Sequence, residues 1–186
     1  QVEAGDHIIL IGRVVQYAYN TQAPLGFCRG AYVSFGITPG MLQLVSSPGS
    51  LRVGAIIESN GQILLERNHE TGQLHLPASD SVGNIATLDS LLGKLASAGI
   101  EVDLPFIYAA YHEDSRRFVY YLGELLSIDD AVETSSMRFY EFDNITWEEI
   151  GDSAIIAMLE RYIREKRLGN YSIYIGDRAQ GEVHPA

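Results

Sequence analysis

LRVGAIIESNGQILLERN (residues 51–68) opens the stretch of the chain that decides the fold. It places a β-branched run at 53–57 before a Ser-Asn-Gly turn and a second apolar run at 63–65, the pattern of a β-hairpin. LHLPAS (residues 74–79) follows, and from residue 84 apolar side chains recur at helical spacing as far as Gly99, where a left-handed helix cap fits. The stretch therefore predicts two paired strands, a turn and a helix.

This order resembles the core of the Nudix family. Residues 76–77 match the Leu-Pro of the family's Leu-Pro-Gly-Gly turn, Ala78 and Ser79 stand in place of its glycines, and residues 99–100 match the end of its sequence box. The resemblance implies an α+β fold, a Nudix-like α/β/α sandwich. It also implies a helix whose Arg-Glu-x-x-x-Glu-Glu pattern holds magnesium against a nucleoside diphosphate linkage.

The acidic pattern of that family is missing from this helix. The matching positions carry other residue types: Asn84, Leu92, Gly93, Ala96 and Ser97. Magnesium prefers several oxygen ligands in octahedral array, whereas this helix offers one carboxylate, Asp89. We therefore expect a degenerate Nudix box that binds no metal and hydrolyses nothing. The alternative is an active nucleoside diphosphate hydrolase with substitute acids such as Asp80, Asp89 and Glu101.

The residues that replace the glutamates are small or apolar. We therefore expect protein to cover this face of the helix. The candidates for the cover are residues 171–175, the segment before Ser50 and a second copy of the chain. The alternative is drift on a solvent-exposed helix.

Two segments near the start of the chain, GDHIILIGRVV (5–15) and PLGFCRGAY (24–32), carry a second resemblance. They are similar to the C-terminal end of the flavin reductase family, whose members are FMN-binding split β-barrels and usually dimers. The resemblance implies that Asp6, His7, Arg29 and Tyr32 lie on the flavin or nicotinamide side of the site. The alternative for His7 is a strand-entry histidine bonded to the backbone.

In that family most FMN contacts lie upstream of this segment. We therefore expect the chain to be a fragment of a longer protein, with FMN and NAD(P)H-dependent flavin reduction belonging to the parent protein and no catalysis by this chain alone. The alternative is that a complete small domain begins here. ITPGMLQLVSSPGS (37–50) holds two turn signatures and predicts a linker. The predicted division is a split-barrel remnant at 1–36, a Nudix-like domain at 51–170 and a terminal strand and tail at 171–186.

Further strands are predicted at 106–111, 118–122 and 137–142, and a helix at 152–169 with Asp152 or Ser153 as its cap and Gly169 at its end. We expect the polar side chains of this helix to point outward: Glu160, Arg161, Arg164 and Lys166. Residues 171–175 can add an edge strand or cover another domain.

Aromatic and basic residues on these strands suggest a ligand. Because aromatic faces stack on adenine or flavin rings and arginine binds phosphate bidentately, Arg67, Tyr108 and Tyr120 are candidates for holding a nucleotide-like ligand. Cross-strand packing of the tyrosines and a solvated turn charge are the alternatives. The domain would then serve ligand binding, regulation or dimerisation; a purely structural domain is the competing view.

Composition limits the classes of partner. The net charge of −11 argues against nucleic acid, and the single cysteine, Cys28, excludes an internal disulfide and a Cys-rich zinc site. The chain has no apolar run of membrane-spanning length. We expect a cytoplasmic protein that takes a small nucleotide or flavin and forms, as one option, a homodimer.

Overall fold

The computed structural model describes residues 2–4, 7–9, 13, 15, 25–28, 31–34, 49–80, 88–129, 132 and 136–185. The chain divides into two compact units, Gln1–Gly36 and Ile37–Ala186, and each is described by itself. Among the described residues, no helix combines the length and the apolar character needed to cross a membrane.

The first unit holds two short antiparallel pairs of strands. β1 (Val2–Ala4) pairs with β2 (His7–Ile9), and β3 (Leu25–Cys28) pairs with β4 (Ala31–Ser34). In the sequence between Ile9 and Leu25, the structure describes only Arg13 and Val15. The side chains of these four strands lie outside the described part of the chain.

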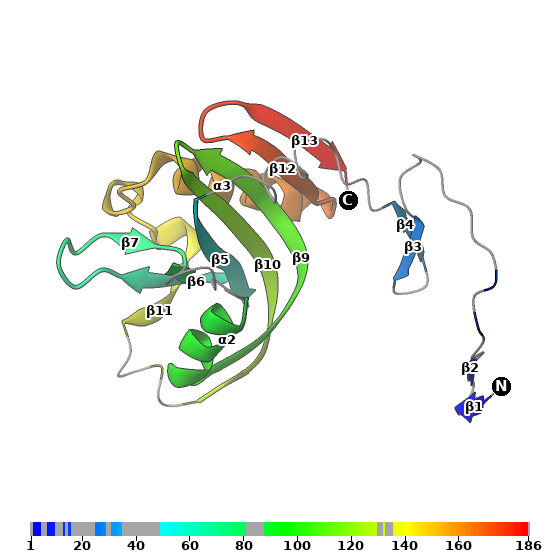
Figure 1. Cartoon of the computed structure of the whole chain (residues 1–186). Coiled ribbons are helices and arrows are strands. Elements are labelled where there is room, and N and C mark those ends of the chain that lie inside the picture. Colours follow the sequence, from blue (N-terminus) through cyan, green and yellow to red (C-terminus); the bar gives the residue numbers. More distant parts are fainter. Residues whose placement is uncertain are drawn as a thin grey trace. The chain divides into compact units, whose positions relative to one another are not determined.

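A mixed sheet of nine strands forms the centre of the second unit (Figure 1). Its strands are β5 (Ser50–Ser59), β6 (Gln62–Arg67), β7 (Leu74–His75), β8 (Ala78–Asp80), β9 (Ile100–Glu113), β10 (Arg116–Ile128), β11 (Met137–Glu141), β12 (Ser172–Asp177) and β13 (Gly181–Pro185). The main path runs β11-β6-β5-β10-β9-β12-β13, with β7 paired to β6 and β8 to β5. The pairs β5–β10 and β9–β12 are parallel, and the others are antiparallel.

The predicted hairpin within residues 51–68 is present, and the strands predicted at 106–111 and 118–122 also pair as a hairpin. Asn60 and Gly61 join β5 to β6 with φ of 52° and 82°, the left-handed conformations that a two-residue hairpin loop requires. Asp114, with φ of 51°, lies in the turn between β9 and β10. These two strands extend beyond the predicted ranges, so the connecting turn is shorter than expected.

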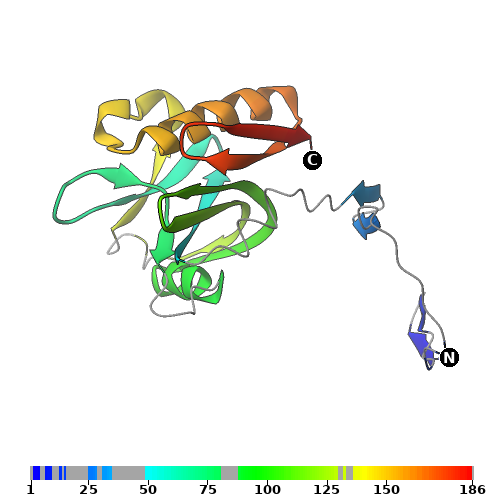
Figure 2. The ribbon, with the colours of Figure 1, turned by 45° about the horizontal axis from the view of Figure 1, so that its top comes forward.

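Two helices cover opposite faces of the sheet: α2 (Leu88–Ser97) and α3 (Ser153–Leu168). Figure 2 shows α3 above the sheet and α2 below it. Alternation along β5 explains the division, because Ile56 packs in the core beneath α3 while Ala55 and Ile57 pack in the core beneath α2. The layers confirm the expected α+β class and the α/β/α arrangement.

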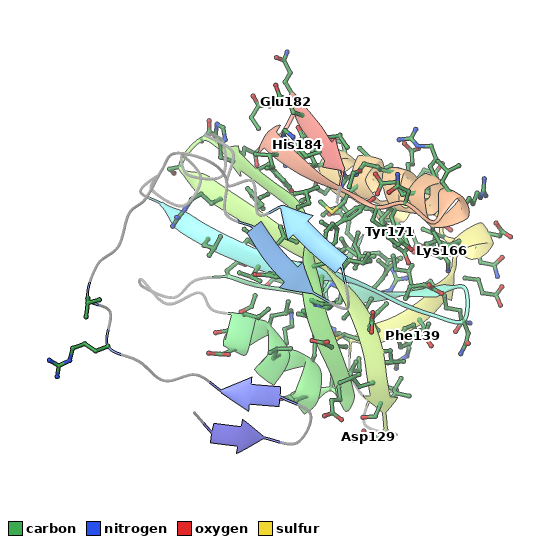
Figure 3. All side chains as sticks on the ribbon, turned by 90° about the vertical axis from the view of Figure 1, so that its right-hand side faces the viewer. Asp129, Phe139, Lys166, Tyr171, Glu182 and His184 are labelled. Carbon is green, nitrogen blue, oxygen red and sulfur yellow. The ribbon has the colours of Figure 1, made fainter. Side chains whose placement is uncertain are left out.

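The caps of α3 are those that its sequence predicts. The Asp152 carboxylate accepts a hydrogen bond from the Ala154 amide at 2.9 Å, and Gly169 ends the helix with φ of 65°. Past this end the chain re-enters the sheet as β12. In Figure 3, Lys166 and Tyr171 lie at this end of the helix, where the Lys166 ammonium is 2.6 Å from the Glu58 carboxylate.

Of the three candidates considered as a cover for α2, residues 171–175 lie elsewhere, with Tyr171 packed against Tyr162 of α3. This segment pairs with β9 as part of β12, because its alternating apolar residues complete the sheet. Gly93, Ala96 and Ser97 are exposed within the described part of the chain.

Candidate functional site

The residues that match the metal-binding pattern of the resembled family belong to α2 and to the segment before it in the sequence. In this chain the helix directs Leu91 and Leu95 into the core, and Gly93, Ala96 and Ser97 face outward without a carboxylate. Asp89 is exposed in the first turn. Residues 81–87, between β8 and α2, contain no acidic residue.

An ammonium group occupies the gap between β8 and α2. The Lys94 Nζ is 2.6 Å from the Glu66 carboxylate and donates a hydrogen bond to the Ala78 carbonyl at 2.9 Å. Glu66 is 9% exposed and is the buried charged residue among the described residues. Its carboxylate also accepts a hydrogen bond from the Ser136 hydroxyl at 3.3 Å. The Lys94 ammonium therefore binds oxygen atoms of the types that magnesium prefers.

Two of the three acids considered as substitutes, Asp80 and Glu101, are engaged with other side chains. Asp80 pairs with Arg52 at 3.1 Å and lies 3.9 Å from Arg116, and Glu101 accepts a hydrogen bond from Ser127 at 2.9 Å. Within the described ranges, no three His, Cys, Asp or Glu side chains come together in a group that would hold a metal ion. The residues present do not fit the magnesium site that the resemblance implies.

A polar cavity of about 190 Å³ opens beside β5 and β10, on the side where α3 begins. Its arginines are matched by acids: Arg52 with Asp80 at 3.1 Å, and Arg178 with Asp152 at 2.8 Å. Tyr120 lines this cavity, and burial raises its pKa to about 12 against the opposing effect of Arg52. The charges of this cavity are therefore largely balanced within the protein.

A second, larger cavity of about 280 Å³ lies between α3 and the strands β9, β12 and β13. We call it the α3 cavity. Its lining is mainly apolar and small, and it includes Ala109, Ala154, Ala157 and Met158. Arginines from α3 and from the β12–β13 turn complete the wall, namely Arg161, Arg164 and Arg178.

Arg161 was expected to point outward, and the structure contradicts this. Its guanidinium lies 3.9 Å from the centre of the Tyr108 ring and donates hydrogen bonds to the backbone carbonyls of Tyr108 at 2.8 Å and Ser172 at 3.4 Å. The planar guanidinium stacks on an aromatic face, so an arginine at this position packs where a lysine would not. Arg164, one turn further on, is exposed.

The structure does not bring together the three residues proposed to hold a nucleotide-like ligand. Tyr108 is fully buried with its hydroxyl unpaired among the described residues, and burial raises its pKa. Arg67 pairs with Glu149 at 3.0 Å and donates a hydrogen bond to the Gly72 carbonyl at 2.7 Å. Tyr120 lines the polar cavity, whereas Arg67 and Tyr108 line neither cavity.

The proposed flavin-side residues lie outside what the structure describes. Asp6 and Arg29 are not described, and His7 and Tyr32 are described only as backbone of β2 and β4.

Sequence reasoning missed Lys94 and Glu66. A lysine in the last turn of a helix is ordinarily a favourable charge at the C-terminal dipole, so its type alone gives no signal. The informative feature is a glutamate within the apolar run of β6, because a buried carboxylate requires a partner.

Comparisons with known proteins agree with both resemblances. The chain is 32% identical to "Probable flavin reductase" from Rhizobium meliloti (strain 1021), over 99% of this chain and 57% of that protein. It is 31% identical to the reductase component of the flavin-dependent trigonelline monooxygenase from Acinetobacter baylyi, over 98% of this chain and 56% of that protein. The chain thus spans a little more than half the length of these relatives.

The structure is similar to a Nudix hydrolase from Nitrosomonas europaea, with a TM-score of 0.60 and 20% identity over 83% of this chain and 93% of that one. At this identity the likeness concerns the fold. No family model matches the chain. The chain is therefore similar to flavin reductases over nearly its whole length, and it shares the fold of the Nudix hydrolases.

Proposed function

We propose that this chain is the C-terminal part of a flavin reductase-like oxidoreductase, in which the parent protein binds FMN and reduces flavin with NAD(P)H. Similarity to two flavin reductase proteins over 98–99% of the chain supports this proposal. Asp6, His7, Arg29 and Tyr32 are proposed to lie on the flavin or nicotinamide side. FMN would supply the redox chemistry, and these residues would bind and orient it.

The second unit, in this proposal, keeps the Nudix fold without hydrolytic chemistry and binds a small ligand. One observation carries this view: the Lys94 ammonium lies between the Glu66 carboxylate and the Ala78 carbonyl. A divalent cation entering this gap would meet a positive charge already paired at 2.6 Å and would have one nearby carboxylate instead of several.

The proposed absence of hydrolysis is tested on the chain itself. Incubated with magnesium and ADP-ribose or FAD, the chain should release no nucleotide above a control without protein. Magnesium-dependent release that disappears in Asp89→Ala or Asp80→Asn would establish the alternative, an active hydrolase with substitute carboxylates.

The proposed binding of FMN is tested by following FMN fluorescence during titration with the natural protein at full length. We expect binding that weakens at least about tenfold in Tyr32→Ala and Arg29→Ala, since each loses a ring or charged contact. Equal affinity in both variants would remove these residues from the flavin site.

A further inference from the structure

The α3 cavity has the composition of a ligand site. Its volume of about 280 Å³ is near the lower end for small-molecule pockets, and its space exists because alanines occupy positions where larger side chains would fill it. Ala109 comes from the sheet, and Ala154 and Ala157 come from consecutive turns of α3. Val183, 52% exposed on β13, adds apolar surface to the wall.

Two arginines at this cavity lie outside the ion pairs of the described residues. Arg161 and Arg164 are neighbours on α3, and within residues 49–80, 88–129 and 136–185 neither lies in an ion pair with a carboxylate. The partners of Arg161 are carbonyl oxygens and an aromatic ring, which orient the guanidinium but leave its charge in place. In a chain with a net charge of −11, a local pair of cations outside ion pairs favours an anion.

Arg178, the third arginine of the lining, offers less attraction to an anion. Arg178 is bound by Glu113 at 3.1 Å and by Asp152 at 2.8 Å. An anionic group would therefore bind toward Arg161 and Arg164, and the remainder of the ligand would lie along the apolar wall.

The wall also contains flat aromatic surface. Tyr174 lies with its ring centre 6.0 Å from the Arg161 guanidinium, and its hydroxyl donates a hydrogen bond to the Asp177 carbonyl at 2.7 Å, which fixes the ring. Tyr111 is buried and stacked on Phe118 at 4.8 Å. The fixed Tyr174 ring can pack against a planar aromatic ligand, while the Tyr111 ring closes the wall behind it.

From these observations we infer that the α3 cavity binds a small aromatic carboxylate, with the ring on the apolar wall and the carboxylate on Arg161 and Arg164. The inference rests on the proposed role of the second unit in ligand binding and names the ligand class. Arg164 is exposed and can donate two parallel hydrogen bonds to a carboxylate, while Arg161, whose Nη1 and Nη2 donate to the Ser172 and Tyr108 carbonyls, adds positive charge beside it. This cavity lies on the α3 side of the sheet, apart from the Lys94 and Glu66 pair on the α2 side.

Isothermal titration of the chain with 2-naphthoate tests the inference, with the uncharged 2-naphthamide as the matched ligand. We expect 2-naphthoate to bind about tenfold more tightly than the amide, and Arg164→Gln to remove most of that difference. Arg167→Gln is the control variant, since Arg167 is exposed on the same helix and does not line the cavity. Equal binding of the two ligands would overturn the inference.

A second variant tests the location by filling the space. Ala157 is exposed at the cavity, so Ala157→Phe should keep the fold, checked by circular dichroism, and weaken 2-naphthoate binding at least tenfold. Glu160→Phe, on exposed surface outside the cavity, should leave binding unchanged. Undetectable binding of 2-naphthoate to the unsubstituted chain, or tighter binding of AMP, would contradict the assignment. Neither result alters the hydrolysis or flavin tests, which involve other residues.

Discussion

The residue on α2 that bears most directly on the proposed lack of metal binding is Lys94. Lys94 lies on α2, next to the core residue Leu95 and three residues after the core residue Leu91. Its ammonium balances the buried Glu66 carboxylate. No sequence pattern predicts this contact, because the partners are 28 residues apart and meet only when α2 packs on β6.

Lys94→Met should therefore destabilise the fold by leaving Glu66 without its cation. We expect a loss of about 2 kcal/mol in unfolding free energy, less than for a fully buried pair, because Lys94 is 36% exposed. Urea denaturation measures the change. Lys94→Met combined with Glu66→Gln should recover part of the loss, and Arg167→Met should change stability by less than about 0.5 kcal/mol. An unchanged unfolding free energy in Lys94→Met would show that the Lys94–Glu66 pair contributes nothing to stability.

The Glu58 and Lys166 pair predicts a pH dependence. Burial raises the pKa of Glu58, but hydrogen bonds from the Lys166 ammonium, the Gly61 amide and the Tyr162 hydroxyl outweigh it, so its pKa lies below the ordinary value of 4.5. A lowered folded pKa gives stability that is present above the unfolded pKa and is lost as the pH falls through the folded one. The stability cost of Lys166→Met should therefore be present at neutral pH and shrink below about pH 4. A cost that stays constant down to about pH 3 would contradict this account.

Features of single helices and strands that depend on a few neighbouring residues were predictable from the sequence. The Asn-Gly turn, the Asp152 cap and Gly169 each act within a few residues, and each is found as predicted. The sequence did not predict that β12 would lie parallel to β9, because that pairing joins residues more than 60 positions apart. Arg161 was misjudged for the same reason, since its partner Tyr108 is 53 residues away.

Gly54 and Gly93 differ in the space around them, and this difference determines how replacement by alanine changes stability. A Cβ at Gly54 in β5 would lie 2.4 Å from the Tyr120 ring and 3.1 Å from the Pro77 carbonyl, whereas a Cβ at Gly93 in α2 meets nothing within 4 Å. Gly54→Ala should destabilise the fold by about 1–3 kcal/mol through overpacking. Gly93→Ala should stabilise it by up to about 1 kcal/mol through helix propensity. Thermal unfolding compares the two, and a destabilising Gly93→Ala would show that this face of α2 is covered in solution.

Two observations concern the whole molecule. The chain is similar to flavin reductases over 98–99% of its length, and its second unit has a Nudix fold. Fold and chemistry can separate, because the fold depends on the apolar alternation of β5, β6, β9 and β10, while metal-dependent hydrolysis depends on a few carboxylates that can be lost without disturbing the core.

The most direct measurement uses NADH, which is both a hydride donor for flavin reduction and a dinucleotide with a cleavable diphosphate linkage. The natural protein at full length is incubated with NADH, FMN and magnesium under oxygen-free conditions, and the products are separated by chromatography. The account predicts NAD⁺ and reduced FMN with the diphosphate linkage intact. Magnesium-dependent appearance of AMP, or no oxidation of NADH, would contradict it.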